Sequence, residues 1–552
     1  MNPIHQIQTA FIHHLITFFK LTPHDAHAFG MLSINDSELK SHQGDLSSTC
    51  ALQLSRYLSR NPRDIARDIA ESFSHRAIER TECVNPGFLN FYLTHEAFAA
   101  LASFFYTHQD RAFKPAALQR RNYSIEFVSA NPTGPLHFGH GRGGIIGDVL
   151  GNILSFLGHT VTKEFYINDA GAQITKLGLS LRARCLQQLG KDVPMPEDGY
   201  HGDYLVQIAQ DLVAQKTPEQ IETADVSFFS CYAQAKLLDS IEKTLSRYGI
   251  RYDVWFSEKI LHDSGAITRV LDQLRAAGYV YEKEGALWFE ATRFGDDKDR
   301  VVARSTGELT YVAADIAYLC NKVERGNNEL VMVLGQDHHG YAARLYAALK
   351  AVKLDNQAIL STILYQLVRM THEQEYIKMS KRAGMIVTLD DVVDRVGTDI
   401  ARFFYLYRKA DAHLDFDLAL AVTHSDENPV YYIQYALVRT KSILHKARQN
   451  TVFASLSAAD LASIGPSETL VLKKIAHLEY VLASVAKNHQ THVLAYYTHE
   501  LAQIFNRYYG NHTVINPAEV SQSRARLCTV SLVESTLTLL LRLLGITAPE
   551  HM

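Results

Sequence analysis

Residues 123–140, YSIEFVSANPTGPLHFGH, carry the clearest structural signal in this chain. The first six residues alternate and include β-branched and aromatic side chains, so they predict a strand over 123–128. The segment 131–135, NPTGP, ends that strand, and helical apolar spacing resumes over 139–157. Glycine beside a helix N-terminus lets the backbone approach a ligand closely, and the helix end favours phosphate oxygens. The stretch therefore predicts strand, tight turn and helix, with an anion at the turn.

A second segment, residues 378–382 (KMSKR), reads as a loop. Lys378 and Lys381 are compact cations on flexible stems, able to close over a polyphosphate during its displacement. His137 and His140 can donate hydrogen bonds to phosphate oxygens as charge builds on them. Taken alone, the histidine segment is more typical of a helix cap or a satisfied polar group than of a binding site, and the lysine segment is more typical still of a solvated loop. The order of the two segments in the chain, together with the strand, tight turn and helix around the first one, predicts an ATP site.

The composition is that of an ordinary folded protein with several domains. The chain has 552 residues, 47% of them hydrophobic, and a formal net charge of −4. This charge argues against a general basic coat for nucleic acid, so any RNA contact must come from local patches. No apolar run reaches the ~20 residues that span a bilayer, and the N-terminus shows no small-residue cleavage site. We therefore expect a cytoplasmic protein with no membrane partner.

Cysteine and histidine spacing gives no sign of a metal centre. The six cysteines are scattered without a CxxC pair, and the 26 histidines include no HExxH spacing. We expect free thiols, no protein-held zinc and no metal ligands from the protein.

The apolar pattern divides the chain into α/β and helical parts. Residues 1–112 predict a small α/β domain, because a helical start is followed by a turn and an apolar strand at 85–93. Over 113–384, strand candidates alternate with helices, as in a Rossmann-like, doubly wound, mostly parallel sheet. Residues at about 190–257 interrupt the alternation and are expected to form an insertion. The strand candidates after the first are 161–167, 286–290, 330–334 and 359–368.

Beyond residue 384 we expect helices to the end of the chain. A helical connection over 385–427 would begin at the capping sequence 388–391, and Asn428 with Pro429 opens an all-α bundle over 428–552. Ligands of doubly wound sheets bind beyond the carboxyl ends of the strands. Both the histidine segment and Gln336 follow strand candidates, where this rule places a site.

These segments resemble the signatures of one enzyme family. Residues 137–140 are similar to the HIGH motif and residues 378–382 to the KMSKS loop of class I aminoacyl-tRNA synthetases, with Arg382 in place of the final serine. Further stretches look like bacterial arginyl-tRNA synthetases: 126–134 (EFVSANPTG), 168–173 (NDAGAQ), 311–318 (YVAADIAY), 428–436 (NPVYYIQYA), and the regions 85–93 and 544–552 near the two ends of the chain.

The resemblance implies an arginine–tRNA ligase that acts in protein biosynthesis. Such an enzyme activates L-arginine with ATP to arginyl adenylate and pyrophosphate, then transfers arginine to the 3′-terminal adenosine of tRNA(Arg). His137, His140, Lys378 and Lys381 would be catalytic, and Mg²⁺ would arrive with ATP rather than in a protein site. The residues that the resemblance assigns to ATP are His137, Phe138, Gly139, His140, Lys378, Met379, Ser380 and Lys381.

The side chains expected around arginine suit its chemistry. A guanidinium presents five donors and a permanent charge, so its pocket needs carboxylates and oriented acceptors. By resemblance, Glu126, Tyr311 and Asp315 hold the guanidinium; Tyr311 and Asp315, at i and i+4, would share one face of a helix. Asn131 and Gln336 would hold the amino and carboxylate end. Each acid alone would be better explained by a surface salt bridge, but the match of five positions in sequence order favours an arginine pocket.

The C-terminal bundle is the expected anticodon reader, and the N-terminal domain is expected to contact tRNA by resemblance. Tyr431, Tyr432 and Tyr435 can stack on bases, with Arg439 on a phosphate. Aromatic residues at this spacing are more often core, so we expect at least one of the three tyrosines to be buried. The family resemblance also favours a monomer.

Two other interpretations remain at this point. A different HIGH-type nucleotidyl transferase would charge another amino acid or ligate a small molecule, and a non-catalytic relative would only bind tRNA. The C-terminal bundle argues against a ligase that uses no tRNA, and the retained histidines and loop lysines argue against an inactive relative.

Overall fold

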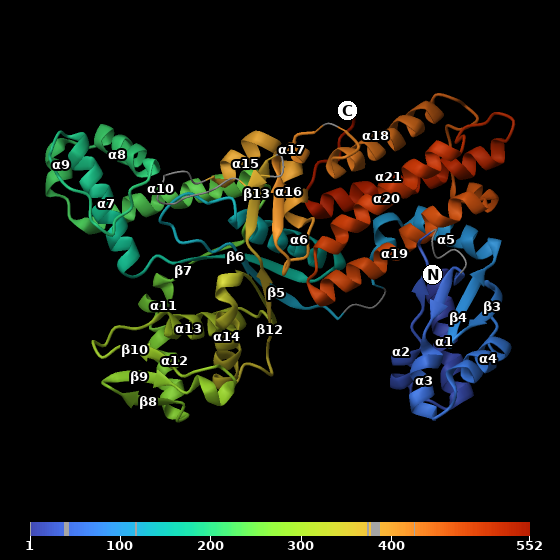
Figure 1. The fold of residues 1–552 in the computed structure, drawn as a ribbon, viewed down its shortest axis with the longest axis horizontal. Coiled ribbons are helices and arrows are strands. Elements are labelled where there is room, and N and C mark those ends of the chain that lie inside the picture. Colours follow the sequence, from blue (N-terminus) through green and yellow to red (C-terminus); the bar gives the residue numbers. More distant parts are fainter. Residues whose placement is uncertain (1, 38–42, 116–118, 373–374, 377–386, 424) are drawn as a thin grey trace.

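The computed structural model describes residues 2–552 apart from 38–42, 116–118, 373–374, 377–386 and 424. The molecule is elongated, with a central α/β core (Figure 1). The N-terminal domain and the C-terminal helical bundle lie together at one end, and a separate helical lobe projects at the other.

The N-terminal domain is the predicted small α/β domain. Its antiparallel sheet has the order β1-β2-β4-β3, and Phe11, Phe73 and Phe91 pack edge to face beside it. The strands are β1 (Ser33–Ile34), β2 (Leu46–Ser48), β3 (Ile78–Val84) and β4 (Phe88–Leu93). The helices are α1 (Pro3–Phe19), α2 (Pro23–Phe29), α3 (Cys50–Leu58), α4 (Pro62–Ser72) and α5 (His95–His108).

A five-stranded parallel sheet forms the central core, with the order β12-β11-β5-β6-β7. This order has β5 at the centre, and the chain reaches its neighbours through crossover helices, as the doubly wound prediction requires. The strands are β5 (Asn122–Phe127), β6 (Thr160–Ile167), β7 (Val254–Ser257), β11 (Glu329–Gly335) and β12 (Ile359–Tyr365). The helices that adjoin the site are α6 (His140–Leu157), α13 (Tyr311–Glu324) and α14 (His339–Ala351).

The predicted strand, turn and helix at 123–157 is confirmed, and glycines explain how closely α6 packs on the sheet. Every residue of β5 after Asn122 is buried. A Cβ on Gly147 would lie 2.3 Å from the Phe127 ring, and one on Gly143 would lie 2.6 Å from Tyr365. Only glycine permits these approaches, so the sequence of α6 fixes its distance from the strands that it covers.

Two predicted assignments in the core are wrong. Residues 286–290 form β9 (Ala286–Phe289), but β9 pairs with β8 (Val280–Lys283) and β10 (Arg300–Ala303) in a separate antiparallel sheet. Glu284 and Gly285 both have positive φ, at 55° and 74°, and form the hairpin turn that sends the chain back at once. The insertion predicted at 190–257 includes β7, which is instead the edge strand of the main sheet. Helices α11 (Lys259–Asp263) and α12 (Ala266–Ala276) connect β7 to this antiparallel sheet.

Four helices build a lobe with a core of its own, and we call residues 172–247 the helical lobe. Leu177, Leu205, Ile221 and Phe229 lie in its buried cluster, to which all four helices contribute. The lobe begins before the predicted insertion, because α7 belongs to this cluster. Its helices are α7 (Ala172–Gln188), α8 (Asp203–Gln215), α9 (Pro218–Thr223) and α10 (Val226–Arg247).

The connection to the bundle is not all helical, contrary to the prediction for 385–427. β15 (Leu414–Asp417) pairs in parallel with β13 (Val368–His372), and β13 also pairs with β14 (Glu375–Tyr376). The residues of β15 alternate between buried and exposed, which is the strand period, but the run is only four residues long. The helices of this region are α15 (Leu389–Val396), α16 (Thr398–Leu406) and α17 (Leu418–Ala421).

Long antiparallel helices form the predicted C-terminal bundle. Its last helix is long and apolar enough to cross a membrane by length and composition, but 72% of its most apolar window is buried inside the protein, as in a core helix. The helices are α18 (Pro429–Arg448), capped by Asn428 as predicted, α19 (Pro466–Asn488), α20 (His492–Asn511) and α21 (Val520–Leu544).

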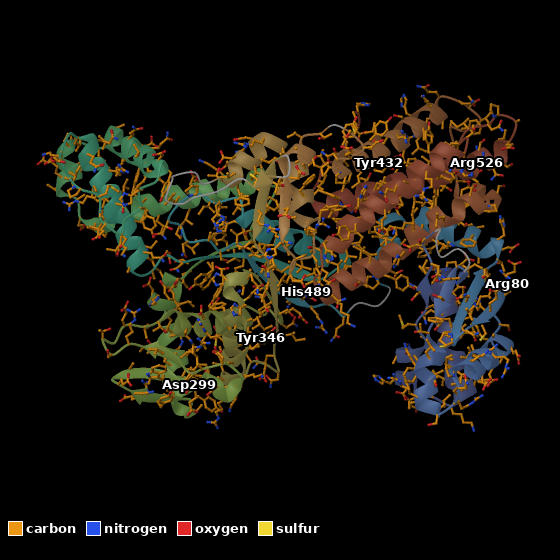
Figure 2. The ribbon with its side chains drawn as sticks, in the orientation of Figure 1. Arg80, Asp299, Tyr346, Tyr432, His489 and Arg526 are labelled. Carbon is orange, nitrogen blue, oxygen red and sulfur yellow. The ribbon has the colours of Figure 1, made fainter. Side chains whose placement is uncertain are left out.

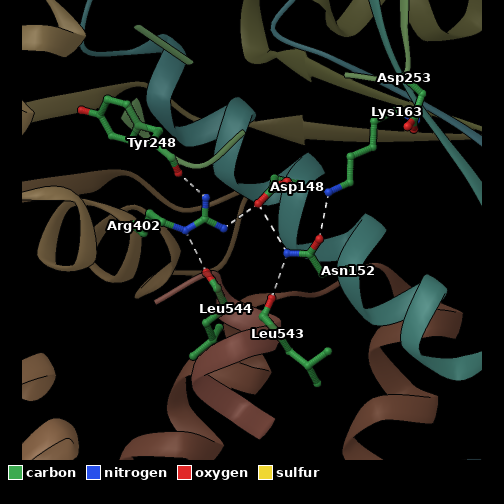
Figure 3. Close-up of polar contacts among 8 residues, drawn as sticks. All are labelled: Asp148, Asn152, Lys163, Tyr248, Asp253, Arg402, Leu543 and Leu544. Carbon is green, nitrogen blue, oxygen red and sulfur yellow. Dashed lines mark hydrogen bonds and ion pairs between the residues drawn. The ribbon is translucent and has the colours of Figure 1, made fainter. Parts of the chain in front are cut away.

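A buried polar network joins this bundle to the core (Figure 3). Arg402 of α16 donates to the Asp148 carboxylate on α6, to the Leu544 carbonyl and to the Tyr248 carbonyl, at 2.6, 2.9 and 2.6 Å. Asn152, also on α6, donates to the Leu543 carbonyl at 3.2 Å. The last carbonyls of α21, which have no partner within their own helix, are thereby satisfied from the catalytic core.

Candidate active site

One cavity of about 730 Å³ opens at the carboxyl ends of the parallel strands. Residues from β5, α6, α13 and the connection after β11 reach it, although they are far apart in the chain. Those predicted residues that line it are Glu126, Asn131, His137, Phe138, Gly139, His140, Tyr311, Asp315 and Gln336. The sheet topology therefore brings together all the predicted ATP and arginine residues that the structure describes.

The two histidines lie at the start of α6, and each contacts the other. His140 is the first residue of the helix, and its Nδ1 accepts a hydrogen bond of 3.2 Å from the His137 backbone. Their rings stack with centroids 3.7 Å apart. This contact orders both rings beside the positive end of the helix, where an anion is favoured.

Residues 378–382, the predicted lysine loop, lie outside the described residues. The chain that follows is anchored beside the histidines: the Phe138 backbone N–H donates to the Val387 carbonyl at 3.0 Å, and the Leu389 N–H donates to the Leu136 carbonyl at 2.9 Å. Thr388 caps α15 with a capping box, as its sequence predicted. Val387 is six residues from Lys381, so the described anchor is close in sequence to the predicted catalytic lysine.

Glu126 already has a cationic partner in the structure. Its Oε2 accepts from Lys322 Nζ at 2.6 Å and its Oε1 accepts from the Ser129 hydroxyl at 3.1 Å. Lys322 is fully buried on α13, and its ammonium also lies 4.4 Å from the centre of the Tyr318 ring. Since Lys322 comes seven residues after Asp315 on the same helix, this helix carries both the counter-charge of Glu126 and the neighbouring acid.

Asp315 is the carboxylate with an unused acceptor. Its Oδ1 accepts from the Tyr341 hydroxyl at 2.6 Å, while its Oδ2 is buried and has no hydrogen-bond partner in the described part of the chain. Burial raises the pKa of Asp315 to about 7. Tyr311 begins α13 one turn earlier and is 54% exposed, so the predicted pair lies at the helix end that faces the cavity.

Sequence reasoning missed a third acid next to this pair. Glu258 is buried directly after β7 and shares a hydrogen bond with Tyr166, which lines the cavity. Burial raises the pKa of the Glu258 carboxyl, and the charge of Glu258 in turn raises the pKa of Asp315. Recognition of β7 as a sheet strand would have found Glu258, because the residue after a parallel strand lies at the edge where ligands bind.

The remaining two predicted arginine contacts lie on loops at the cavity. The Asn131 amide donates to Gln173 Oε1 at 3.1 Å, and Gln173 also lines the cavity. Gln336 follows β11 at once, in a single 3-10 turn that precedes α14. Within the described residues, no group of three or more His, Cys, Asp or Glu side chains is placed to hold a metal ion.

The predicted tRNA tyrosines lie on α18, far from the cavity along the chain, and Figure 2 labels Tyr432 on the bundle. Tyr431 and Tyr435 stack in parallel, with ring centroids 6.2 Å apart. The Arg439 guanidinium lies 4.6 Å from the centre of the Tyr435 ring. The expectation that at least one of the three tyrosines is buried is wrong: Tyr431 and Tyr432 are half-buried and Tyr435 is 39% exposed. The core face of α18 is formed mainly by its aliphatic residues, and the three tyrosines lie outside that buried face.

Three family models match the chain in the order of these parts. Residues 6–93 match the arginyl tRNA synthetase N terminal domain, residues 105–403 match the catalytic domain of class I tRNA synthetases (R), and residues 433–552 match the DALR anticodon binding domain.

Relatives named arginine–tRNA ligase align over nearly the whole chain. The arginine–tRNA ligase of Moorella thermoacetica is 42% identical over 93% of this chain and 92% of its own length, and that of Bacillus licheniformis is 40% identical over 93% of each. The solved arginyl-tRNA synthetase of Thermus thermophilus has the same fold, with a TM-score of 0.76, 22% identity and coverage of 99% of this chain and 100% of its own. The chain therefore belongs to the arginine–tRNA ligases, a family of class I aminoacyl-tRNA synthetases.

Proposed function

We propose that the cavity at the carboxyl ends of the strands is where this arginine–tRNA ligase joins arginine to ATP. The arginine carboxylate attacks the α-phosphorus, pyrophosphate leaves, and a hydroxyl of the terminal adenosine of tRNA(Arg), the 2′-hydroxyl by class I resemblance, then takes the arginyl group from AMP. The observation that carries this proposal is the convergence of two histidines and two carboxylates from three separate elements on one cavity. The protein's task is then positioning and charge stabilisation.

In this proposal the phosphates of ATP lie at the start of α6. His137 and His140 are ordered there by their mutual contact, and the helix end favours negative charge. Lys378 and Lys381 would neutralise the departing pyrophosphate; Lys381 is joined to Val387, beside Phe138, by a segment that spans at most ~20 Å. Mg²⁺ would enter with ATP, because in such sites it is held by substrate phosphates and retained water rather than by a dedicated protein cage.

The guanidinium of arginine would pair with Asp315. Glu126 is already neutralised by Lys322, whereas Asp315 Oδ2 is buried without a partner among the described residues, so an entering cation with fixed donors fits it. Tyr311 would cover the guanidinium from the helix start, and Glu126 would accept from its far side. Asn131 and Gln336 would hold the amino and carboxylate end of arginine.

Transfer RNA would be bound by the domains at the two ends of the chain. Tyr431, Tyr435 and Arg439 form a partly exposed stack on α18, the kind of surface on which splayed bases stack, and Tyr432 lies beside it. We assign residues 1–112 to tRNA contact, 113–384 to catalysis, 385–427 to a connection near the acceptor stem and 428–552 to the anticodon. We expect the enzyme to act as a monomer in the cytoplasm.

Transfer of labelled arginine to total bacterial tRNA, against the other amino acids, tests the substrate. His140→Ala and Lys381→Ala should each lower arginine-dependent ATP–pyrophosphate exchange, measured with tRNA present, by about two to four orders of magnitude. His24→Ala, an exposed histidine on α2 of the N-terminal domain, is the matched control and should keep the full rate. Wild-type exchange in the His140 or Lys381 variant would overturn the assigned roles.

A further inference from the structure

The loop between β5 and α6 begins in a strained conformation. Val128 and Ser129 both have positive φ, at 66° and 39°, although neither is glycine and valine is β-branched. Such residues persist in this region only where surrounding contacts hold them. The Ser129 hydroxyl provides one such contact, because it donates to Glu126 and accepts from the Tyr166 backbone at 3.1 Å each.

The far side of this loop is held by the helical lobe. The Tyr204 hydroxyl, on α8, donates to the Thr133 carbonyl at 2.6 Å. Gln173, on α7, accepts from the Asn131 side chain at 3.1 Å. Two helices of the lobe therefore contact the short segment 131–133 that presents Asn131 to the cavity.

Tyr204 is well placed to act as a fixed donor. Its ring packs against the apolar core of the lobe, and burial raises its pKa to about 12, so its hydroxyl stays protonated at neutral pH. A Cβ on Gly134 would lie 3.4 Å from the Tyr204 oxygen, so the loop residue that follows Thr133 also lies close to the tyrosine.

The lobe itself is anchored to the core at its other end. Thr244 and Arg247, in the last turn of α10, both contact the Asp390 carboxylate on α15. The base of the lobe is thus fixed beside the histidine segment, while α8 reaches over to the loop. Figure 1 shows α10 running from the projecting helices back to the core.

We propose that Tyr204 is a positioning residue for arginine: it holds the 131–133 loop through the Thr133 carbonyl and so keeps Asn131 where it meets the α-amino group of the substrate. This inference rests on the role proposed above for Asn131. It gives the helical lobe a function in amino-acid recognition, because the lobe holds the loop that carries Asn131 and also contributes Gln173 to the cavity lining. The guanidinium end, held by α13, does not depend on this contact.

Tyr204→Phe tests the proposal, because it removes only the hydroxyl and keeps the packed ring. Loss of one hydrogen bond should raise the KM for arginine about three- to tenfold and leave the KM for ATP unchanged. Tyr232→Phe is the matched control: it removes a buried hydroxyl in the same lobe that has no hydrogen-bond partner among the described residues. Equal KM values for arginine in the two variants would overturn the proposal.

A second readout isolates the α-amino group. 5-Guanidinopentanoate is arginine without that group, and its inhibition constant should be the same in wild type and Tyr204→Phe. A variant that weakens both ligands equally would show that the hydroxyl shapes the whole pocket, which contradicts a route through Asn131. In the double variant Tyr204→Phe/Asn131→Ala, the KM for arginine should not exceed that of Asn131→Ala, because the two residues act in one path.

The single variant Asn131→Ala tests the role of Asn131 separately from that of Tyr204. If it weakens arginine but not 5-guanidinopentanoate while Tyr204→Phe has no effect, the role of Tyr204 is refuted and that of Asn131 stands. If Asn131→Ala changes neither ligand, the assignment of Asn131 falls and the inference falls with it.

Discussion

Arginine affinity should depend on pH through Asp315. Burial raises the pKa of this carboxyl to about 7, so at neutral pH about half of the free enzyme carries a protonated Asp315. The guanidinium of arginine stays charged at every pH of interest and pairs only with the ionised form. Binding of arginine must therefore release a proton, and affinity must rise with pH.

The size of this effect follows from the ionised fraction. The apparent dissociation constant is the intrinsic constant divided by the fraction of enzyme in the competent form. With a pKa of about 7, that fraction is roughly 0.9 at pH 8, 0.5 at pH 7 and 0.1 at pH 6. Arginine should consequently bind about tenfold more weakly at pH 6 than at pH 8.

Isothermal titration calorimetry of arginine, in the absence of ATP, measures this directly. Binding is preferred to reaction rates because a rate also contains the pH dependence of the chemical steps. Titrations in buffers of different ionisation enthalpy should report release of about 0.1 proton at pH 8, 0.5 at pH 7 and 0.9 at pH 6.

Asp315→Asn should remove both the proton release and the pH dependence. It should also weaken arginine binding by about two to four orders of magnitude at pH 8, because an unpaired buried charge costs ~3–5 kcal/mol. Glu258→Gln is the control, since burial raises the pKa of Glu258 as well. Proton release that survives in Asp315→Asn and disappears in Glu258→Gln would refute the assignment, as would an affinity that is constant from pH 6 to 8.

Three further outcomes follow from the described contacts. Asp315→Asn should raise the thermal midpoint of the ligand-free enzyme more at pH 8 than at pH 5: burial raises the folded-state pKa of Asp315 from 3.8 to about 7, so the cost of this carboxyl to the folded state grows as the pH rises from 3.8 to about 7, and a differential scan at the two pH values checks the sign. Arg402→Leu should lower the free energy of unfolding by roughly 3–5 kcal/mol, because Asp148 loses a buried partner. Denaturant titration by circular dichroism measures this loss, and the stability of Arg402→Lys should lie between those of the wild type and Arg402→Leu. Tyr435→Ala should raise the KM for tRNA about five- to 150-fold through loss of ~1–3 kcal/mol of base stacking, with the KM for arginine unchanged in steady-state charging assays.

Signals from residues close together in the sequence were sufficient to predict the helices and the part of the site at 123–157. The capping box at Thr388, the cap at Asn428 and the strand-turn-helix at 123–157 each involve residues a few positions apart, and each formed as predicted. The cavity followed from them because parallel strands all end on one edge of the sheet. This rule explains why the predicted ATP and arginine residues that the structure describes lie together.

The features that the sequence did not predict depend on partners far away in the chain. β7 and β15 have four residues each, too few for a periodic signal, and each is a strand only because another strand lies beside it. The pairing of Lys322 with Glu126 joins residues 196 positions apart, and it changes which acid is expected to pair with the guanidinium of arginine. Glu126 looked like a free acid in the sequence, whereas its charge is already balanced and Asp315 supplies the open acceptor.

Helix α6 connects the cavity to the C-terminal bundle in one rigid element. Its first residue, His140, lies at the cavity, and Asp148 and Asn152 follow two and three turns later. Asp148 accepts from Arg402, which also donates to the Leu544 carbonyl, and Asn152 donates directly to the Leu543 carbonyl. Both carbonyls are at the end of α21, the last helix of the tRNA-binding bundle. Since the two bonds of Arg402 are buried and involve its charge, the bundle cannot shift without either breaking them or moving α6. The position of the anticodon bundle is therefore set by the same helix that carries His140, and under the proposed function a bound tRNA is held in a fixed register with the site that activates its amino acid.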